Sequence, residues 1–379
     1  MSEKRLQVIF AGGGTGGHLY PAIAISEQLG DRSDSVDSHF VCSTRPLDAK
    51  LLSEEGVAFT PVAARPFALS PLRLAEFVRT WPSVVRACRR VIASLRERGP
   101  VVVVAMGGFV SAPAASAARK ARVPLVLVNL DATPGKANRW VAKRSDRVFT
   151  AAEPEGRGYA TWERVRPIVR WAAIADGDRA FCRRQLGLDP DKPLLLVTGA
   201  SQGARSINAM MVRMLQTQPS RFMGWQVIHQ CGPATLGGGG EFDEQAIVSA
   251  YAKAGVPAVV KPLFREMGRV WGAAEVAISR CGAGSVAEAW ANRVPSVFLP
   301  YPYHKDEHQR KNAIPLERAG GAVIVKDHVD AAANEADAGS VLLGLMDEPE
   351  KREAMTRRLR ELGPPDGAGV VAEAILRLK

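Results

Sequence analysis

Short apolar runs alternate with helix-length segments along this chain, and the pattern restarts half-way. The runs of the first half span Leu6–Gly12, His39–Thr44, Val101–Met106, Pro124–Leu130 and Arg147–Ala152. The second half repeats the pattern with Leu194–Ala200, Trp225–Gly232, Ala258–Leu263, Glu275–Gly282 and Pro295–Pro302. Strands separated by helix-length segments are typical of βαβ units in a parallel sheet. The sequence therefore predicts an α/β fold with two doubly wound halves.

The length of the chain agrees with two domains, because 379 residues exceed what one hydrophobic core usually serves. Polar and helical residues between Arg170 and Pro193 bridge the two patterns and mark the hinge. The segment after Pro349 has a helical pattern without a strand. We expect an N-terminal domain over residues 1–168, a second domain over residues 169–348 and a C-terminal helix over residues 349–379.

Composition narrows the classes of partner. The formal net charge of +11 suits nucleic acid, an anionic membrane surface or a phosphorylated substrate. The sequence has no aromatic-basic RNA motif and no zinc-finger spacing, so we expect no nucleic-acid partner. Its five cysteines are scattered without a CxxC pair, which is typical of reduced thiols in the cytosol rather than of disulfides or a metal site.

Neither a signal peptide nor a membrane span is expected. The N-terminus runs directly into the first strand without a cleavage site. Residues 100–118 are uncharged and long enough to raise the question of a span. They contain Gly107, Gly108 and Pro113 among many small residues. A buried strand, a loop and a helix of small residues is therefore the better interpretation.

The first glycine-rich loop follows the first strand and precedes a helical pattern. It runs from Gly12 to Gly17 and is followed by His18. Glycines allow a close backbone approach, and the N–H groups that open a helix favour an anion. The loop has GxGxxG spacing, but the second strand ends without the acidic residue of a dinucleotide site. We expect a phosphate site rather than NAD chemistry, with a glycine turn needed for packing alone as the alternative.

Three loops of the second half lie in the same strand-to-helix context. Ser201 belongs to the loop Gly199–Arg205, whose backbone amides suit a diphosphate. Glu288 lies one helical turn after the next glycine loop, where a carboxylate could bind ribose hydroxyls or merely favour the helix dipole. His308 and Gln309 follow a polar loop at the carboxyl end of a strand, where open α/β sheets bind ligands.

Five ordered blocks resemble the MurG family of bacterial peptidoglycan enzymes across nearly the whole chain. The blocks are GGGTGGHLYPAIAI, MGGFVSAP, GASQGARSIN, the stretch from PLFREM through RCGAGSVAEAWANRVPSVFLPYP, and HKDEHQRKNA. The resemblance implies a GT-B fold, in which a C-terminal helix packs back toward the first of two Rossmann-like domains. It implies inverting transfer of N-acetylglucosamine from UDP-N-acetylglucosamine to lipid-linked N-acetylmuramyl-pentapeptide, without a metal or other cofactor. It also implies a peripheral enzyme at the cytoplasmic face of the cell membrane.

The resemblance further implies roles for individual residues. The donor would be bound by Thr15, Gly16, Gly17, Arg170, Ser201, Phe264, Ala283, Glu288 and Gln309. The acceptor would lie against Gly107, Gly108, Phe109 and Asn138. Within the donor set, Arg170 and Ser201 would contact the diphosphate, and Phe264 would lie near the uracil. The carboxylate of Glu288 would bind the ribose, while Ala283 and Gln309 would contact the sugar.

Two segments depart from the family pattern on the acceptor side. The family's His-Glu-Gln-Asn run is replaced here by residues 128–131, Val-Asn-Leu-Asp, and its Gly-Asn-Pro-Val by residues 166–169, Arg-Pro-Ile-Val. Another lipid or polyprenyl acceptor is therefore an alternative, as are a UDP-sugar epimerase and a catalytically silent nucleotide-sugar binder. His18 and Asp131 are the candidate general bases. Asp131 could instead hydrogen-bond a sugar hydroxyl or a turn.

The segment Arg65–Arg98 combines aromatic residues with arginines. Phe77 and Trp81 lie among eight arginines, which only two glutamates oppose. An arginine-rich amphipathic surface suits the anionic headgroups of a membrane. We therefore expect this segment to contact the membrane that carries the acceptor. The alternative is a packed helix with a solvated basic face.

Overall fold

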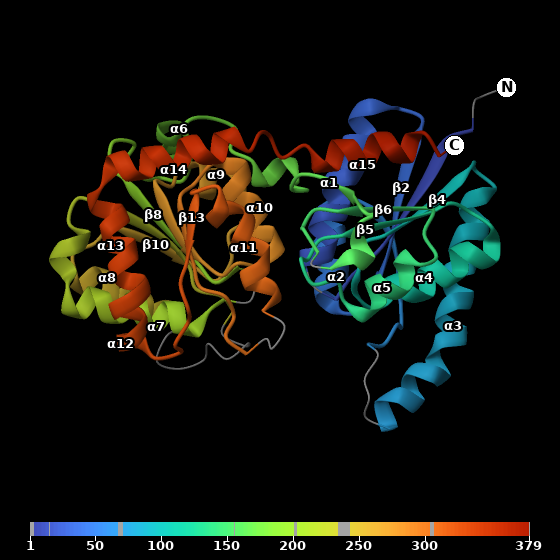
Figure 1. The fold of residues 1–379 in the computed structure, drawn as a ribbon, viewed down its shortest axis with the longest axis horizontal. Helices are drawn as coiled ribbons and strands as arrows, with labels where there is room; N and C mark the ends of the chain where they lie inside the picture. Colours follow the sequence, from blue (N-terminus) through green and yellow to red (C-terminus); the bar gives the residue numbers. More distant parts are fainter. Residues whose placement is uncertain are drawn as a thin grey trace. The chain divides into compact units, whose positions relative to one another are not determined.

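The computed structural model describes residues 4–14, 16–66, 71–154, 156–200, 203–233, 243–303 and 307–378. The chain divides into two compact units (Figure 1). Unit 1 comprises Met1–Arg170 and Asp366–Lys379, and unit 2 comprises Trp171–Pro365. The sequence places the boundaries at 168/169 and 348/349, whereas the structure places them at 170/171 and 365/366. The second boundary differs because the last segment contains two helices, one in each unit.

In the described part of unit 1, seven strands form a parallel sheet in the order β3-β2-β1-β4-β5-β6-β7. The strands are β1 (Leu6–Ala11), β2 (Val36–Ser43), β3 (Ala58–Val62), β4 (Val101–Ala105), β5 (Leu125–Asn129), β6 (Arg147–Thr150) and β7 (Glu163–Arg164). The helices are α1 (Gly16–Arg32), α2 (Pro46–Glu54), α3 (Pro71–Arg96), α4 (Gly108–Ala121), α5 (Lys136–Ala142) and α15 (Gly367–Leu376). Helix α4 packs against α3 and α5, whereas α1 packs against α2 and α15.

The described part of unit 2 repeats this topology with six parallel strands in the order β10-β9-β8-β11-β12-β13. The strands are β8 (Leu194–Thr198), β9 (Gln226–Gln230), β10 (Ala258–Lys261), β11 (Val276–Ser279), β12 (Ser296–Phe298) and β13 (Ala322–Ile324). The helices are α6 (Arg179–Gln185), α7 (Arg205–Thr217), α8 (Glu244–Lys253), α9 (Met267–Gly272), α10 (Ala283–Asn292), α11 (His308–Arg318), α12 (Ala331–Asn334), α13 (Ser340–Asp347) and α14 (Pro349–Glu361). The predicted α/β class with two doubly wound halves is confirmed.

Burial on both faces explains why the central strands are continuous apolar runs. Every residue of β1, β4, β5, β8 and β9 is buried. In unit 2, Leu195 and Val197 belong to one hydrophobic cluster, whereas Leu194 and Leu196 belong to another. Successive side chains of a strand point to opposite faces, so helices cover both faces of this sheet. Each such side chain contributes about 1.5–3 kcal/mol on burial.

The strand order fixes where the loops meet. In both sheets the order reverses beside the first strand of the unit, between β1 and β4 in unit 1 and between β8 and β11 in unit 2. Ligands of doubly wound sheets bind at this switch point, beyond the carboxyl ends of the strands. The glycine loop after β1 and the loop after β4 therefore share one edge. The loops after β8 and β11 do the same in the second unit.

Three edge strands were not indicated by the sequence. Strand β3 contains Pro61 and is only partly buried, which is tolerated at a sheet edge where one row of hydrogen bonds is absent. Strand β7 has two residues and β13 has three. Such short or half-exposed segments lack the apolar run that identified the central strands.

The last two helices belong to different units. Helix α14 lies in unit 2, and α15 lies in unit 1, where it packs along α1 (Figure 1). The guanidinium of Arg166 pairs with Asp366 at 3.0 Å just before α15 begins. None of the helices in the described ranges combines the length and apolar character that a membrane span requires. The uncharged residues 100–118 form β4 and most of α4.

Candidate functional site

A buried carboxylate holds the glycine loop that follows β1. The backbone N–H of Gly14 donates to both carboxylate oxygens of Asp48, at 3.1 and 2.8 Å. The backbone N–H and the hydroxyl of Ser43 donate to the same carboxylate at 3.1 and 2.6 Å. The guanidinium of Arg45 donates to the Gly14 carbonyl at 2.6 Å. The acidic residue that the end of β2 lacks is thus supplied by α2, and it is occupied by the loop itself.

The loop after β4 lies directly against the glycine loop and His18. Gly107 and Gly108 have φ angles of +101° and +73°, which favour glycine. A β-carbon on Gly108 would lie 2.9 Å from the Gly13 carbonyl oxygen, and one on Gly107 would lie 3.0 Å from Cε1 of His18. Both positions therefore require glycine for close packing as well as for conformation. The structure thus brings the predicted residues His18, Gly107 and Gly108 together.

The imidazole of His18 combines low solvation with an unused ring nitrogen. Within the described residues, Nδ1 of His18 is the buried side-chain polar atom that has no hydrogen-bond partner. Burial lowers the pKa of His18, while the negative charge of Asp131, the nearby backbone of Met106 and the charge of Asp48 oppose the shift. The ring is therefore neutral at neutral pH, the state in which it can accept a proton.

An amide chain connects β5 to the same region. Asn138 on α5 donates to Oδ1 of Asn129 at 2.9 Å, and a β-carbon on Gly107 would lie 3.3 Å from Oδ1 of Asn138. Asn129 donates to the backbone carbonyl of Asp131 at 2.8 Å and to the Thr150 hydroxyl at 3.1 Å. The predicted residues Asp131 and Asn138 thus lie on one hydrogen-bonded chain, and Asn129 joins them.

In unit 2, the described residues of the loop after β8 lie close to the neighbouring strands. Ala200 and Gly203 have φ angles of +59° and +74°. A β-carbon on Gly203 would lie 2.5 Å from the Cys231 carbonyl oxygen. The side-chain amide of Gln230 donates to the Ala200 carbonyl at 3.0 Å and accepts from the Phe264 backbone N–H at 2.9 Å. Gln230 therefore connects this loop to Phe264, the residue assigned to the uracil.

A buried ion pair supports the loop after β11. Arg280 pairs with Asp327 at 2.6 Å, and the Ser206 hydroxyl lies 2.6 Å from the same carboxylate. Burial works to raise the pKa of Asp327, but the Ser206 hydrogen bond and the charge of Arg280 hold it below its usual range. Arg280 also donates to the carbonyls of Leu299 and Pro300. One side chain thus ties together the loops that follow β11 and β12.

Helix α10 presents the predicted ribose ligand with its carboxylate already oriented. Ala283 is the first residue of α10, after the N-cap Gly282, and Glu288 is half-buried on the second turn. The indole N–H of Trp271, a fully buried side chain on α9, donates to Oε2 of Glu288 at 2.8 Å. Sequence reasoning missed this partner, because no local pattern indicates the packing of α9 on α10.

The remaining residues predicted to bind the donor are divided between the two units. Gln309 lies in the first turn of α11 and accepts from the Tyr301 backbone N–H at 3.0 Å. Arg170 is the last residue of the first segment of unit 1, where it pairs with Glu55 at 2.7 Å and covers the Tyr20 ring. Within unit 1 it therefore contacts α1 and the end of α2. Gly16 and Gly17 open α1, while Thr15 and Ser201 lie outside the described residues.

An aromatic cluster joins α3 to α5 in unit 1. The rings of Phe77 and Trp81 are 5.3 Å apart, and Trp81 meets Trp140 edge-on at 6.1 Å. The guanidinium of Arg144 lies 3.8 Å from the Trp140 ring centroid. Phe109, the aromatic residue expected to contact the acceptor, lies instead beside the glycine loop under Arg45. Across the described ranges, no group of three or more His, Cys, Asp or Glu side chains is arranged to hold a metal ion.

Two family models match this chain. The glycosyltransferase family 28 N-terminal domain matches residues 8–150, and the glycosyltransferase family 28 C-terminal domain matches residues 194–368. The chain belongs to glycosyltransferase family 28. Membership makes it a glycosyltransferase, in agreement with the enzyme class expected from the sequence blocks. The glycine loops after β1 and β8 lie at the start of the two matched domains.

Relatives of this family 28 chain are similar along nearly its whole length. The UDP-N-acetylglucosamine--N-acetylmuramyl-(pentapeptide) pyrophosphoryl-undecaprenol N-acetylglucosamine transferase of Desulfotalea psychrophila is 31% identical over 383 residues, covering 99% of this chain and 97% of that protein. The protein of the same name from Desulforudis audaxviator is 33% identical over 389 residues, covering 98% of each. These similarities confirm the MurG-family resemblance.

Solved structures show the same fold at lower identity. MurG from Acinetobacter baumannii superposes with a TM-score of 0.70 at 22% identity and covers 99% of each chain. A candidate UDP-N-acetylglucosamine 2-epimerase from Listeria monocytogenes gives a TM-score of 0.63 at 16% identity, covering 99% of this chain and 95% of that one. The predicted GT-B fold is confirmed. Because transferase and epimerase share it, the family 28 match rather than the fold distinguishes between them.

Proposed function

We propose that this chain transfers N-acetylglucosamine from UDP-N-acetylglucosamine to a lipid-linked N-acetylmuramyl-pentapeptide. The observation that carries this proposal is the 31–33% identity, over 98–99% of the chain, to relatives whose name describes this reaction. The arrangement of the two loop clusters supports it. Unit 2 would bind the donor through Ser201, Phe264, Ala283, Glu288 and Gln309, and unit 1 would bind the acceptor.

Charge stabilisation of the leaving diphosphate would come from fixed backbone dipoles. The N-terminus of α10 begins at Ala283, and its free N–H groups would face the negative charge that grows on UDP. The backbone N–H groups of the loop after β8 would supply further donors. Glu288, already oriented by Trp271, would accept hydrogen bonds from the ribose hydroxyls. Bond breaking would thus be assisted by groups that need little rearrangement.

Proton removal from the acceptor hydroxyl would occur at the carboxyl edge of unit 1. His18 is the better candidate base, because its burial keeps the imidazole neutral and its Nδ1 has no partner within the described residues. Asp131 would stabilise the imidazolium that forms, since its negative charge raises the pKa of His18. Gly107, Gly108 and Asn138 would position the acceptor beside this ring.

The test is release of UDP from UDP-N-acetylglucosamine by the purified protein, with and without a short-chain lipid-linked muramyl-pentapeptide. We expect acceptor-dependent release together with a disaccharide product. The variant E288Q should raise the KM for the donor more than it lowers kcat, because the ribose contact is made before and during the reaction. Donor binding without release under any acceptor concentration would reject the proposed acceptor and leave the donor site standing.

A different lipid acceptor is the second candidate, and the segment 128–131 favours it. The amide chain from Asn138 through Asn129 to Asp131 occupies the position where the sequence departs from the family pattern. Supplying diacylglycerol in place of the peptide-bearing lipid tests this candidate. UDP release with diacylglycerol, and none with the muramyl-pentapeptide lipid, would assign the chain to this second reaction.

We further propose that unit 1 binds the membrane surface through α3 and α5. Phe77, Trp81 and Trp140 supply aromatic surface of the kind that membrane interfaces favour. Arg79 and Arg86 are exposed on α3 and would contact anionic headgroups. The partner of this surface is thus an anionic leaflet, one of the partners with which the net charge of +11 is compatible.

Vesicle pelleting tests the membrane proposal. The protein should sediment with phosphatidylglycerol vesicles at low salt and less at high salt, because salt screens exposed charges. The double variant R79Q/R86Q should bind about thirtyfold more weakly, at about 1 kcal/mol for each arginine. The control R119Q/K120Q removes two exposed charges from the end of α4 and should change binding less. Absence of sedimentation at both salt concentrations would reject this surface.

A further inference from the structure

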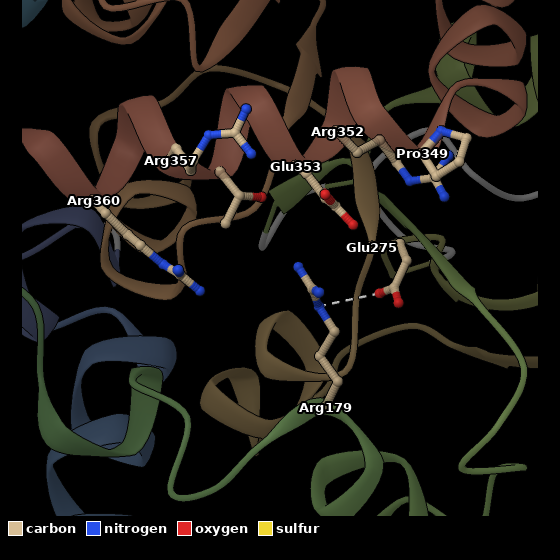
Figure 2. Close-up of a pocket in the computed structure, with 8 residues that line it drawn as sticks. Arg179, Glu275, Pro349, Arg352, Glu353, Arg357 and Arg360 are labelled. Carbon is tan, nitrogen blue, oxygen red and sulfur yellow. Dashed lines mark ion pairs between the residues drawn. The ribbon is translucent and has the colours of Figure 1, made fainter.

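A hollow of about 380 Å³ opens in unit 2 between α14 and the segment around β11. Figure 2 shows Arg179 and Glu275 on one wall, with Arg352, Glu353 and Arg360 of α14 on the other. Glu275 immediately precedes β11, whereas the donor loop that contains Arg280 follows this strand. The hollow therefore lies at the amino edge of the sheet, away from the carboxyl edge that carries the proposed donor site.

One face of α14 supplies most of the lining. Arg352, Glu353, Arg357 and Arg360 follow the spacing of residues that share one side of a helix. The apolar side chain of Leu359 on the same helix is fully buried in the core of unit 2. The helix is therefore fixed by its apolar face, and the charged face is held toward the hollow.

Arginines outnumber acidic residues in this lining, four to two. Glu275 is already engaged, because Arg179 and Arg183 pair with it at 3.1 and 2.8 Å. Arg352 donates to the carbonyls of Leu345 and Met346 rather than to a carboxylate. The lining thus carries excess positive charge that its own acids do not neutralise.

Two of the arginines have guanidinium N–H groups available to a ligand. Considering the residues that the structure describes, the side chains of Arg357 and Arg360 make no hydrogen bond or ion pair. The neighbouring Arg358 differs, since it pairs with Glu361 at 3.1 Å and does not line the hollow. A guanidinium presents several N–H groups in a planar fork that matches phosphate oxygens.

Burial does not remove the charge of the arginine nearest the core. Burial lowers the pKa of Arg352, the negative charge of Glu275 opposes this shift, and the positive charge of Arg179 adds to it. Arginine nevertheless stays protonated in proteins, so Arg352 keeps its positive charge in the folded state. A bound anion would be attracted by the four guanidinium groups of the lining, which exceed its two carboxylates in number.

We propose that this hollow is a second ligand site, which binds the phosphate group of a small soluble molecule through Arg357, Arg360 and Arg179. Glu353 limits the affinity by repelling the same anion. A soluble ligand suits the site better than a lipid headgroup, because the guanidinium groups face one another across a concavity that two glutamates also line. The site is independent of the proposed transferase reaction.

Calorimetric titration of the full chain with inorganic phosphate, and separately with inorganic pyrophosphate, tests this site. Saturating UDP keeps the donor site filled, and constant ionic strength removes the general effect of salt. We expect saturable binding of one anion per chain. R357Q and R360Q should each weaken it by about tenfold, the loss of one charge-assisted hydrogen bond. The matched control R358Q, which removes the same charge from the same helix, should leave it unchanged.

A gain-of-binding variant makes the test independent of folding. E353Q removes the repelling carboxylate and should tighten anion binding severalfold, which a damaged protein would not do. Absence of saturable binding with UDP present would overturn the proposal. Equal weakening by R357Q and R358Q would also overturn it, because the arginines would then act only through the general charge of the helix. The protein could also bind phosphatidylglycerol vesicles through Arg357 and show no binding of inorganic phosphate. That result would reject a soluble ligand in favour of a lipid headgroup.

Discussion

Burial decides the protonation state of His18, and with it the chemistry open to unit 1. A histidine whose folded pKa lies below its ordinary 6.5 is neutral at neutral pH and takes up a proton only in more acidic solution. The negative charge of the nearby Asp131 raises the pKa of His18, so the net shift is the difference between the effect of desolvation and the effect of this charge. Neutral imidazole next to a carboxylate suits proton abstraction from a hydroxyl.

The pH profile tests this role. If His18 is the base, kcat should be level above pH 6.5, the ordinary value for histidine, and should fall only in more acidic solution. H18Q should lower kcat by about 10²–10⁴-fold and abolish this acidic fall. H39Q is the control, because His39 is a half-buried histidine of the same unit that bonds Thr60 instead. Retention of activity in H18Q and its loss in D131N would move the base to Asp131.

A second prediction concerns the orientation of Glu288. W271F removes the indole N–H that bonds the Glu288 carboxylate and keeps most of the apolar ring. Loss of one such bond is worth about 1 kcal/mol, so the Kd for UDP should rise by about fivefold while kcat changes little. W290F removes a comparable indole bond, to the Gly363 carbonyl, and should leave UDP affinity unchanged. If both variants raise the Kd for UDP equally, the cause is a general loss of protein stability and not the orientation of the Glu288 carboxylate.

The loops that follow β1 and β4 in unit 1 pack against each other without room for an added side-chain atom, so a change in one loop should displace the other. G107A adds a β-carbon 3.0 Å from the His18 ring at a φ angle of +101°. We expect the variant to displace the imidazole and to lower kcat by at least about tenfold, with a loss of stability of about 1–3 kcal/mol. G135A is the control, since a β-carbon there meets no atom within 4 Å. Normal kinetics in G107A would contradict this coupling.

Sequence reasoning identified the elements that are strongly patterned and missed those that depend on contacts between distant segments. The central strands were predictable because they are buried on both faces and therefore apolar throughout. The role of Asp48 was not, because the second strand ends without an acid and the carboxylate reaches the loop from α2. The indole of Trp271 reaches Glu288 only through packing of α9 on α10, which no local spacing encodes.

At the scale of the whole molecule, the chain joins its two units at two points. It passes from unit 1 to unit 2 after Arg170 and returns after Pro365, so unit 1 is completed by the last helix of the chain. Helix α15 packs on α1, and Val371 is fully buried there, whereas the adjacent Val370 is 44% exposed. The stability of unit 1 should therefore depend on residues far from it in the sequence.

Adjacent valines on α15 test this dependence within one turn of helix. V371S places a hydroxyl in the core of unit 1 and should lower the stability of that unit by about 2–3 kcal/mol. V370S alters an exposed position and should change stability by less than about 0.5 kcal/mol. Hydrogen exchange followed by mass spectrometry separates the two units. V371S should accelerate exchange in β1 and β4 and leave β8 and β11 protected, because each unit has its own core. Equal acceleration in both sheets would mean that the units unfold together.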